Sequence, residues 1–253
     1  METSNQTPNR VAVVTGGMGG LGTALCQHLA RSGMKVAASY SPDNDSVQDW
    51  LAEQQHQGFE FKAFRVDVTD YASCQSAVSQ IVAEMGAIDV LVNNAGITRD
   101  ASMRKMTLDD WRAVLHTDLD SIFHMSKQVL DGMVERGWGR IINISSVNGQ
   151  KGAFGQANYS AAKAGIHGFT KAVALEVARK GVTVNTVSPG YLRTAMVTKV
   201  PEDIMKTKIL PEIPIGRLGE PDEVAALVAF LASNEAAFIT GANIAINGGQ
   251  HMC

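Results

Sequence analysis

Val11-Ala12-Val13-Val14-Thr15-Gly16-Gly17-Met18-Gly19-Gly20-Leu21-Gly22 joins an apolar, β-branched run to a glycine-rich turn. Glycines at such a turn permit a tight bend and let backbone N–H groups approach a pyrophosphate, and they bring the following helix close to the sheet. Glycine-rich turns also occur for packing alone. The position of this turn between a first strand and a first helix favours a dinucleotide site.

Outward from this turn, short β-branched runs alternate with longer amphipathic stretches to the end of the chain. This alternation predicts a parallel sheet covered by helices on both faces. The predicted strands are residues 11–15, 36–39, 61–66, 88–92, 140–144, 182–187 and 243–246. The predicted helices begin near Gly20, Ser46, Tyr71, Leu108, Asp118, Asn158 and Asp222. Seven strands imply one sheet, and no boundary divides residues 1–253 into two domains.

One long irregular stretch, residues 191–221, interrupts this short-looped pattern and contains Pro201, Pro211 and Pro214. Loops of that length in compact domains are usually functional, so we expect a substrate lid. A surface excursion with its own short helix is the alternative.

Composition excludes several classes of protein. The chain has 253 residues, 45% of them hydrophobic, which fits one large globular domain. With 22 Lys and Arg against 25 Asp and Glu, the net charge of −3 leaves no basic surplus, so nucleic acid is not an expected partner. No apolar run approaches the roughly 20 residues that span a bilayer, and residues 1–9 are polar, so neither a membrane nor a targeting signal is expected.

Cysteine and histidine usage points to neither a disulfide framework nor a metal. Cys26, Cys74 and Cys253 are an odd number at wide spacing without a CxxC pair, which is typical of a reducing cytoplasm. The histidines within predicted helices are His116, His124 and His167. They have no paired cysteine or carboxylate at metal-ligand spacing, so we expect no metal.

A second chemical signal is formed by Ser146, Tyr159 and Lys163. On a helix, Tyr159 and Lys163 are an i, i+4 pair on one face, so the ammonium stands near the phenol. A nearby cation stabilises phenolate, which makes the tyrosine a usable general acid or base. The spacing alone would fit an ordinary surface helix; together with the glycine-rich turn it favours catalysis.

Four ordered motifs resemble the short-chain dehydrogenase/reductase family: the turn at residues 15–22, Asn93-Asn94-Ala95-Gly96, Ser146 with Tyr159-x-x-x-Lys163, and Ser188-Pro189-Gly190. The resemblance implies a doubly wound Rossmann fold in which Tyr159 protonates a carbonyl oxygen as hydride adds to its carbon. Ser146 would hydrogen-bond that oxygen, and Lys163 would hold the nicotinamide ribose. The cofactor-binding residues implied are Gly16, Met18, Gly20, Leu21, Gly22, Tyr40, Asp67, Val68, Asn94, Ala95, Gly96, Tyr159, Lys163, Pro189, Gly190 and Thr194.

Asp118 departs from the family pattern, which commonly has an asparagine as a fourth catalytic residue. If that residue acts through its backbone carbonyl, by anchoring a relay water beside the lysine, aspartate can replace it. An ionised Asp118 would also raise the pKa of Lys163. The alternative is a structural acid at a helix N-terminus.

More specific strings resemble the acetoacetyl-CoA reductases of polyhydroxybutyrate synthesis, among them Arg136-Gly137-Trp138-Gly139-Arg140 and Phe154-Gly155-Gln156. The implied reaction is reduction of acetoacetyl-CoA to (R)-3-hydroxybutyryl-CoA. By the same resemblance, the residues expected near substrate are Asp100, Lys105, Phe154, Gln156 and Tyr191, and Arg193, Lys199, Lys206 and Lys208 are further cations that could meet CoA phosphates.

The alternative substrate is a 3-oxoacyl group on a carrier protein, because 3-oxoacyl-carrier-protein reductases share the fold and the chemistry. Those enzymes often carry an arginine where Gly137 stands, in a basic patch that docks the acidic carrier, so Gly137 favours free CoA thioester. A nucleotide-binding sensor without turnover is a hypothesis of another class. The complete Ser146, Tyr159 and Lys163 set argues against it.

We expect NADH in preference to NADPH. Selectivity for NADPH needs a cation for the 2′-phosphate, and residues 36–61 contain no arginine or lysine. Asp43 and Asp45 would repel a phosphate dianion. NADPH remains the alternative, because a backbone nest with Ser39, Tyr40 and Ser41 could still accept the phosphate. The resemblance further suggests a homotetramer built from the helices that begin near Asp118 and Asn158 and from the last strand.

Overall fold

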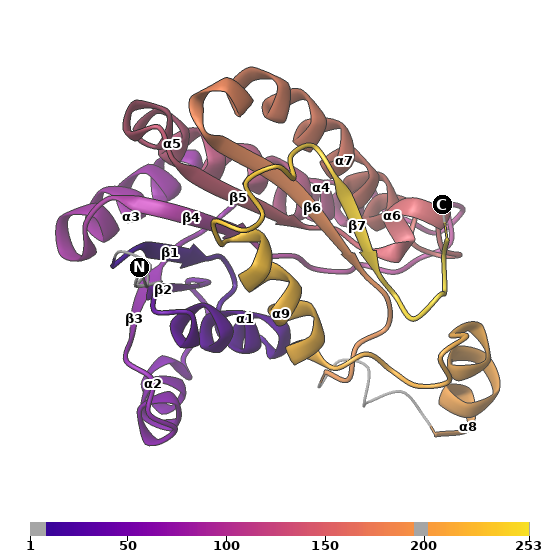
Figure 1. Cartoon of the computed structure of the whole chain (residues 1–253). Helices are drawn as coiled ribbons and strands as arrows, with labels where there is room; N and C mark the ends of the chain where they lie inside the picture. Colours follow the sequence, from indigo (N-terminus) through magenta and orange to yellow (C-terminus); the bar gives the residue numbers. More distant parts are fainter. Residues whose placement is uncertain (1–8, 195–201, 253) are drawn as a thin grey trace.

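The structure, a computed structural model, describes residues 9–194 and 202–252 and contains one sheet of seven parallel strands (Figure 1). The strand order is β3-β2-β1-β4-β5-β6-β7. The strands are β1 (Val11–Val14), β2 (Lys35–Tyr40), β3 (Phe61–Arg65), β4 (Ile88–Asn93), β5 (Gly139–Ile144), β6 (Val182–Pro189) and β7 (Asn243–Ile246). The predicted fold class is therefore confirmed, with strand ends that differ by a few residues.

The main helices are α1 (Gly20–Arg31), α2 (Val47–His56), α3 (Tyr71–Met85), α4 (Leu108–Leu115), α5 (Ser121–Arg136), α6 (Val147–Lys151), α7 (Ala157–Val177) and α9 (Pro221–Leu231). A π-helical turn, η1 (His116–Asp120), joins α4 to α5, so no separate helix begins near Asp118: the helical run that starts with α4 continues through that residue, and α5 itself begins at Ser121. Helix α6 was not expected from the sequence. Its five residues are too few to show helical periodicity.

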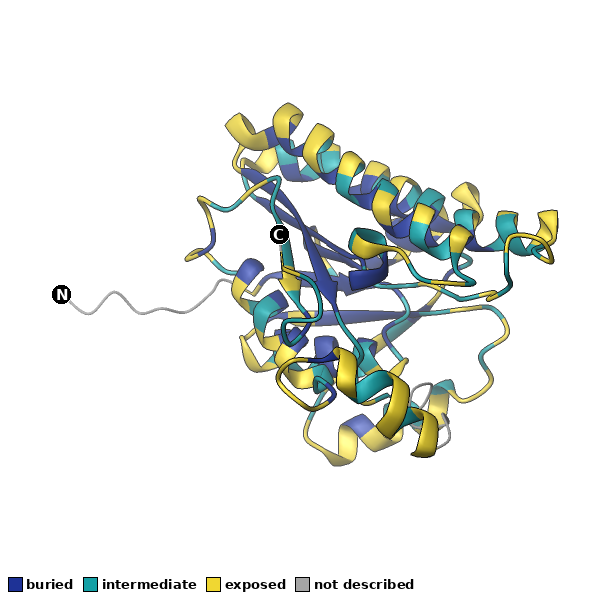
Figure 2. Cartoon of the chain, turned by 90° about the vertical axis from the view of Figure 1, so that its right-hand side faces the viewer, coloured by how far each residue is buried: buried dark blue, intermediate teal, exposed yellow. Residues whose placement is uncertain are grey.

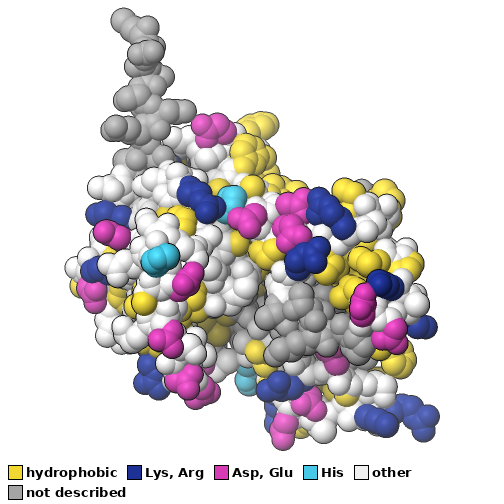
Figure 3. All heavy atoms as spheres, turned by 90° about the horizontal axis from the view of Figure 1, so that it is seen from below, with side chains coloured by type: hydrophobic (Ala, Val, Ile, Leu, Met, Phe, Trp, Pro, Cys, Tyr) yellow, Lys and Arg dark blue, Asp and Glu magenta, His cyan; other side chains and the backbone are white. Residues whose placement is uncertain are grey.

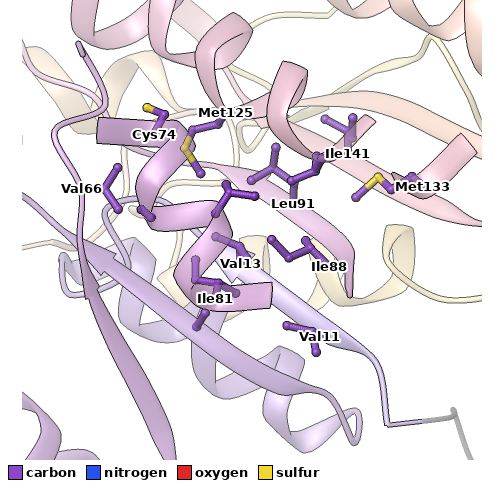
Figure 4. Packing of buried hydrophobic residues seen from close by; sticks show 14 of the residues in the cluster. Val11, Val13, Val66, Cys74, Ile81, Ile88, Leu91, Met125, Met133 and Ile141 are labelled. Atoms are coloured by element: carbon purple, nitrogen blue, oxygen red, sulfur yellow. The ribbon is translucent and has the colours of Figure 1, made fainter. Parts of the chain in front are cut away.

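Helices cover both faces of the sheet, and its central strands are buried between them (Figure 2). Alternate residues of β1 face opposite layers: Val11 and Val13 pack toward α3, α5 and α7, whereas Ala12 and Val14 pack toward α1 and α9. Figure 4 shows part of the first layer, where Ile81 of α3 and Met125 of α5 meet the strands. This two-sided burial explains why the strands are nearly continuous apolar runs.

The reversal of strand order between β1 and β4 positions the functional cleft. Both strands leave the sheet at its carboxyl edge, where parallel sheets of this topology bind ligands. The Thr15 hydroxyl accepts hydrogen bonds from the backbone N–H groups of Asn94 and Ala95 at 2.9 and 3.0 Å. The glycine-rich turn and the loop after β4 are therefore held against each other.

The described part of the segment 191–221 forms three short helical pieces: α8 (Glu202–Ile204), the π-helical turn η3 (Met205–Ile209) and the 3-10 turn η4 (Leu210–Glu212). An ion pair of 3.1 Å between Lys151 of α6 and Glu212 joins this segment to the catalytic side of the cleft. Pro201 and Lys199 lie outside the described residues.

Within residues 9–194 and 202–252, no helix combines the length and apolar character that a membrane crossing requires. Acidic and basic side chains are interspersed on the face seen in Figure 3. On that face, the described side chains form no extended patch of one charge.

Candidate active site

A cleft of about 990 Å³ opens at the carboxyl edge of the sheet. All sixteen predicted cofactor-binding residues line it, from Gly16 of the turn to Thr194 beyond β6, together with Ser146 and Asp118. Its volume lies at the upper end of the range for ligand pockets, which fits a dinucleotide with a small substrate.

The glycine-rich turn has the geometry of an anion site. Gly16 has a φ of 61°, a left-handed conformation that favours glycine. A Cβ on Gly22 would lie 2.1 Å from the Gly16 carbonyl oxygen, so no side chain fits there. The turn leads into α1, whose first turn contains no acidic residue. The free N–H groups and the helix dipole at this end are therefore available to a pyrophosphate.

Tyr159 and Lys163 lie one turn apart on α7 and both line the cleft. The Lys163 ammonium nitrogen is 5.4 Å from the centre of the Tyr159 ring and donates to the Ile144 carbonyl at 3.1 Å. Burial alone would lower the pKa of Lys163, but the Tyr159 phenol and the Asp118 carboxyl outweigh it and raise that pKa. The lysine is therefore held as a cation beside the phenol.

Ser146 faces the same cleft from the end of β5. As the N-cap of α6, its hydroxyl oxygen accepts a hydrogen bond from the Asn148 N–H at 3.1 Å. Because this bond uses the oxygen as acceptor, the hydroxyl proton remains able to point to a substrate oxygen. A Cβ on Gly149 would lie 2.7 Å from the Lys163 backbone, so this glycine lets α6 approach α7.

Asp118 is fully buried in η1 and contacts both sides of the cleft. Its Oδ1 accepts from the Ile97 N–H at 2.8 Å, and its Oδ2 lies 3.3 Å from the Lys163 ammonium. Asp118 does not lie at a helix N-terminus, where the alternative placed it, because the residues before and after it are helical. Burial raises the pKa of Asp118, and Lys163 and the Ile97 N–H oppose that rise.

The far end of the cleft is lined after β2 by Tyr40, Ser41, Pro42, Asp43 and Asn44. Ser39 is buried, and its hydroxyl accepts from the Gly16 N–H at 3.3 Å, so it supports the turn. Among the described residues that line the cleft, Lys163 is the only lysine or arginine. Asp45 lies outside the lining.

The predicted substrate residues separate into two groups. Gln156 and Tyr191 line the cleft, whereas Asp100, Lys105 and Phe154 do not. Asp100 is tied to the cleft indirectly, because its carboxylate accepts from the Gln156 amide at 2.9 Å. Phe154 is 97% exposed, and Lys105 is exposed as well.

The further cations suggested for CoA phosphates are partly engaged. Arg193 pairs with Glu220 at 2.8 Å, and Lys206 pairs with Glu202 at 2.6 Å. Lys208 is exposed and forms no ion pair with a described residue. Lys199 lies outside the described residues.

Two residues that shape the site were not predicted. Asn148 lines the cleft and its amide donates to the Gln156 side-chain oxygen at 2.9 Å, and Ile97 supplies the N–H that holds Asp118. Neither residue type carried a signal in the sequence. Their roles come from the positions that the fold gives them, Asn148 in α6 and Ile97 in the loop after β4.

The histidines have partners other than metals. His124 contacts the Val68 carbonyl at 2.9 Å, and His116 pairs with Asp120 at 3.7 Å. His167 lies 2.9 Å from the Ser145 hydroxyl; burial, and then Lys171, lower its pKa. In the described ranges, no group of three or more histidine, cysteine and acidic side chains could hold a metal ion.

The chain is similar to known proteins along nearly its whole length. A family model described as short chain dehydrogenase matches residues 10–205. The chain is 56% identical over 243 residues to an acetoacetyl-CoA reductase of Cupriavidus necator, covering 96% of this chain and 98% of the relative. It is 53% identical to an acetoacetyl-CoA reductase of Shinella zoogloeoides, with 96% and 98% covered. A 3-oxoacyl-(acyl-carrier-protein) reductase of Vibrio cholerae is 46% identical, with 96% and 98% covered.

Proposed function

Because the chain belongs to the short-chain dehydrogenase family, we propose that it reduces acetoacetyl-CoA to (R)-3-hydroxybutyryl-CoA with a reduced nicotinamide dinucleotide, in polyhydroxybutyrate synthesis. One observation supports this activity above all others: Ser146, Tyr159 and Lys163 line the same cleft as the glycine-rich turn. The identities of 50–56% with four acetoacetyl-CoA reductases, over nearly the whole chain, support the substrate.

The residues of the cleft divide the chemistry between them. A nicotinamide dinucleotide would supply the hydride when bound, and the turn around Gly16 and Gly22 would hold its pyrophosphate. Tyr159 donates its phenolic proton to the carbonyl oxygen, and Ser146 donates a hydrogen bond to the same oxygen. Both donors stabilise the charge that develops there. Lys163 would hold the ribose and would stabilise the phenolate that remains on Tyr159.

We expect purified protein to oxidise NADH in the presence of acetoacetyl-CoA and to form the (R) alcohol, identified by chiral analysis of the product. A matched assay with acetoacetyl-carrier protein should give a lower kcat/KM. Faster turnover of the carrier-linked substrate would replace this assignment by the carrier-protein one, and absence of turnover with both would contradict a reductase.

The residues at the end of α5 favour a free CoA thioester over a carrier-linked thioester as the substrate. Gly137 has a φ of 69° and ends that helix in a left-handed conformation, which disfavours the arginine of the carrier-docking patch. The neighbouring Arg136 pairs with Asp89 at 3.5 Å. Gly137 has no charge and Arg136 is already paired, so neither residue offers an unpaired cation to an acidic carrier protein.

NADH is the proposed cofactor, because the residues after β2 that line the cleft are neutral or acidic. We expect kcat/KM for NADH to exceed that for NADPH about tenfold, since one unsatisfied charged contact is worth roughly 1.5 kcal/mol. Asp43→Arg should raise kcat/KM for NADPH by a similar factor, measured in paired assays on acetoacetyl-CoA. Asp45→Arg makes the same charge change outside the lining and should not. A wild type that favours NADPH would contradict this proposal.

A homotetramer in the cytoplasm is part of the same proposal. Large apolar side chains are exposed on the elements expected to form the interfaces: Phe123 on α5, Leu175 on α7 and Phe238 before β7. Cys26 and Cys74 are free, which suits a reducing compartment. Light scattering should give about four times the chain mass of 27.0 kDa; a monomer mass would exclude the tetramer.

A further inference from the structure

Asp118 brings a negative charge into the catalytic cluster. Its side chain is 0% exposed, and that of Lys163 is 5% exposed. The carboxylate lies 3.3 Å from the ammonium, and the Ile97 N–H fixes its other oxygen at 2.8 Å. A Cβ on Gly96 would lie 2.8 Å from the Asp118 oxygen and 3.3 Å from the lysine nitrogen, so the glycine makes room for this pair.

Few other ionisable groups among the described residues act on Lys163. From α7 itself, Tyr159 faces Lys163, and His167, one turn further on, contacts Ser145 instead. From β5, the lysine donates to the Ile144 carbonyl, and the nearby loop after β4 contributes Gly96, which carries no charge. Among the described residues, Asp118 and Tyr159 are the ionisable groups that act on Lys163.

The carboxylate of Asp118 changes the electrostatic effect of the Lys163 ammonium on the Tyr159 phenol. A lone ammonium stabilises phenolate and favours loss of the phenolic proton. A carboxylate at ion-pair distance cancels much of that field, because the two opposite charges are then seen together from Tyr159. An uncharged amide in the place of Asp118 would leave the ammonium field intact.

We propose that Asp118 is a positioning residue that keeps the Tyr159 hydroxyl protonated, and reduction active, to higher pH by cancelling much of the field that the Lys163 ammonium exerts on the phenol. This inference rests on the proposed function. In reduction, the reduced dinucleotide would lose a hydride from a C–H bond and become oxidised, and this hydride would form the new C–H bond at the carbonyl carbon. The C=O π pair moves to oxygen, and the Tyr159 O–H bond breaks as its proton passes to that oxygen, which leaves phenolate. Oxidation reverses these steps and needs the phenolate. Both directions therefore depend on the same proton.

The test compares wild type, Asp118→Asn and Asp120→Asn in pH profiles of kcat/KM, for reduction of acetoacetyl-CoA and for oxidation of 3-hydroxybutyryl-CoA. In Asp118→Asn, the alkaline limb of reduction and the acid limb of oxidation should both move to lower pH, by about one pH unit. Asp120 is the matched control. It lies in the same π-helical turn, is 48% exposed and faces His116, so its variant should follow the wild-type profile.

If both limbs of the pH profiles stay in place in Asp118→Asn, the proposal is overturned, whatever happens to the maximal rate. A purely structural role would change the height of a profile and not its position on the pH axis. The ultraviolet absorbance of tyrosinate is followed against pH without substrate, as the difference from the corresponding Tyr159→Phe protein. In Asp118→Asn, this absorbance should appear at lower pH than in wild type. If wild type does not turn over acetoacetyl-CoA, the proposed function fails, and this titration still decides the role of Asp118. Should Asp118→Asn not fold, Asp118→Ser removes the charge and takes the same tests.

Discussion

Tyr159→Phe is expected to lower kcat for acetoacetyl-CoA reduction about 10³-fold, with little change in stability. The substitution removes only the phenolic oxygen, so the ring keeps its place on α7. General acid catalysis by a positioned side chain is worth roughly 10²–10⁴-fold, and a loss of 10³ corresponds to about 4 kcal/mol in the activation barrier. Steady-state kinetics with saturating NADH measures the loss.

Cofactor binding should survive this substitution, because the glycine-rich turn and Lys163 are unchanged. The dissociation constant of NADH, followed by fluorescence, is expected to stay within about twofold of wild type. Tyr71→Phe provides the control: Tyr71 is 39% exposed on α3, stacks on Phe123 and lies outside the cleft lining. A Tyr159→Phe protein with wild-type kcat would remove the phenol from the mechanism.

Gly22→Ala is expected to destabilise the protein and to abolish NADH binding. The added Cβ would lie 2.1 Å from the Gly16 carbonyl oxygen and 2.9 Å from two Gly17 backbone atoms. These neighbours are backbone, so the turn itself must move. Overpacking of this kind costs about 3 kcal/mol and would lower the melting temperature by roughly 10 °C. Calorimetry measures the stability, and NADH fluorescence titration measures the binding.

Gly168→Ala is the matched control for this substitution. Gly168 lies in the exposed part of α7, and a Cβ there would meet nothing within 4 Å. Alanine is favoured over glycine inside a helix by about 1 kcal/mol, so this variant should be at least as stable as wild type and should bind NADH normally. If Gly22→Ala behaves like Gly168→Ala, close approach of α1 to the turn is not required.

The sequence was sufficient for the sheet because each strand carries its own local pattern. All seven predicted strands are present, and α1, α3 and α4 begin at the predicted residues. The short helix α6 was missed, because five residues that contain a glycine show neither periodicity nor favourable propensity. The start of α5 was misplaced for another reason: the π-helical turn continues α4 through Asp118 without a capping signal.

The candidate site was predictable in part. The i, i+4 spacing placed Tyr159 and Lys163 on one face of α7, and the order of the strands brought the motifs to one edge. The sequence did not place Asp100 and Phe154 outside the cleft lining, since both lie in loops whose path depends on packing. It also offered two readings of Asp118, which differ only in what surrounds that side chain.

The amino-acid pattern by itself determined the strands, the glycine-rich turn and the phenol with its neighbouring ammonium, because each depends on residues close together along the chain. Only the tertiary structure decided that Asp118 pairs with Lys163 and that Asn148 and Asp100 both hold Gln156. Asp118 and Lys163 are far apart in sequence, and their meeting depends on how α7 packs against the helix that contains η1.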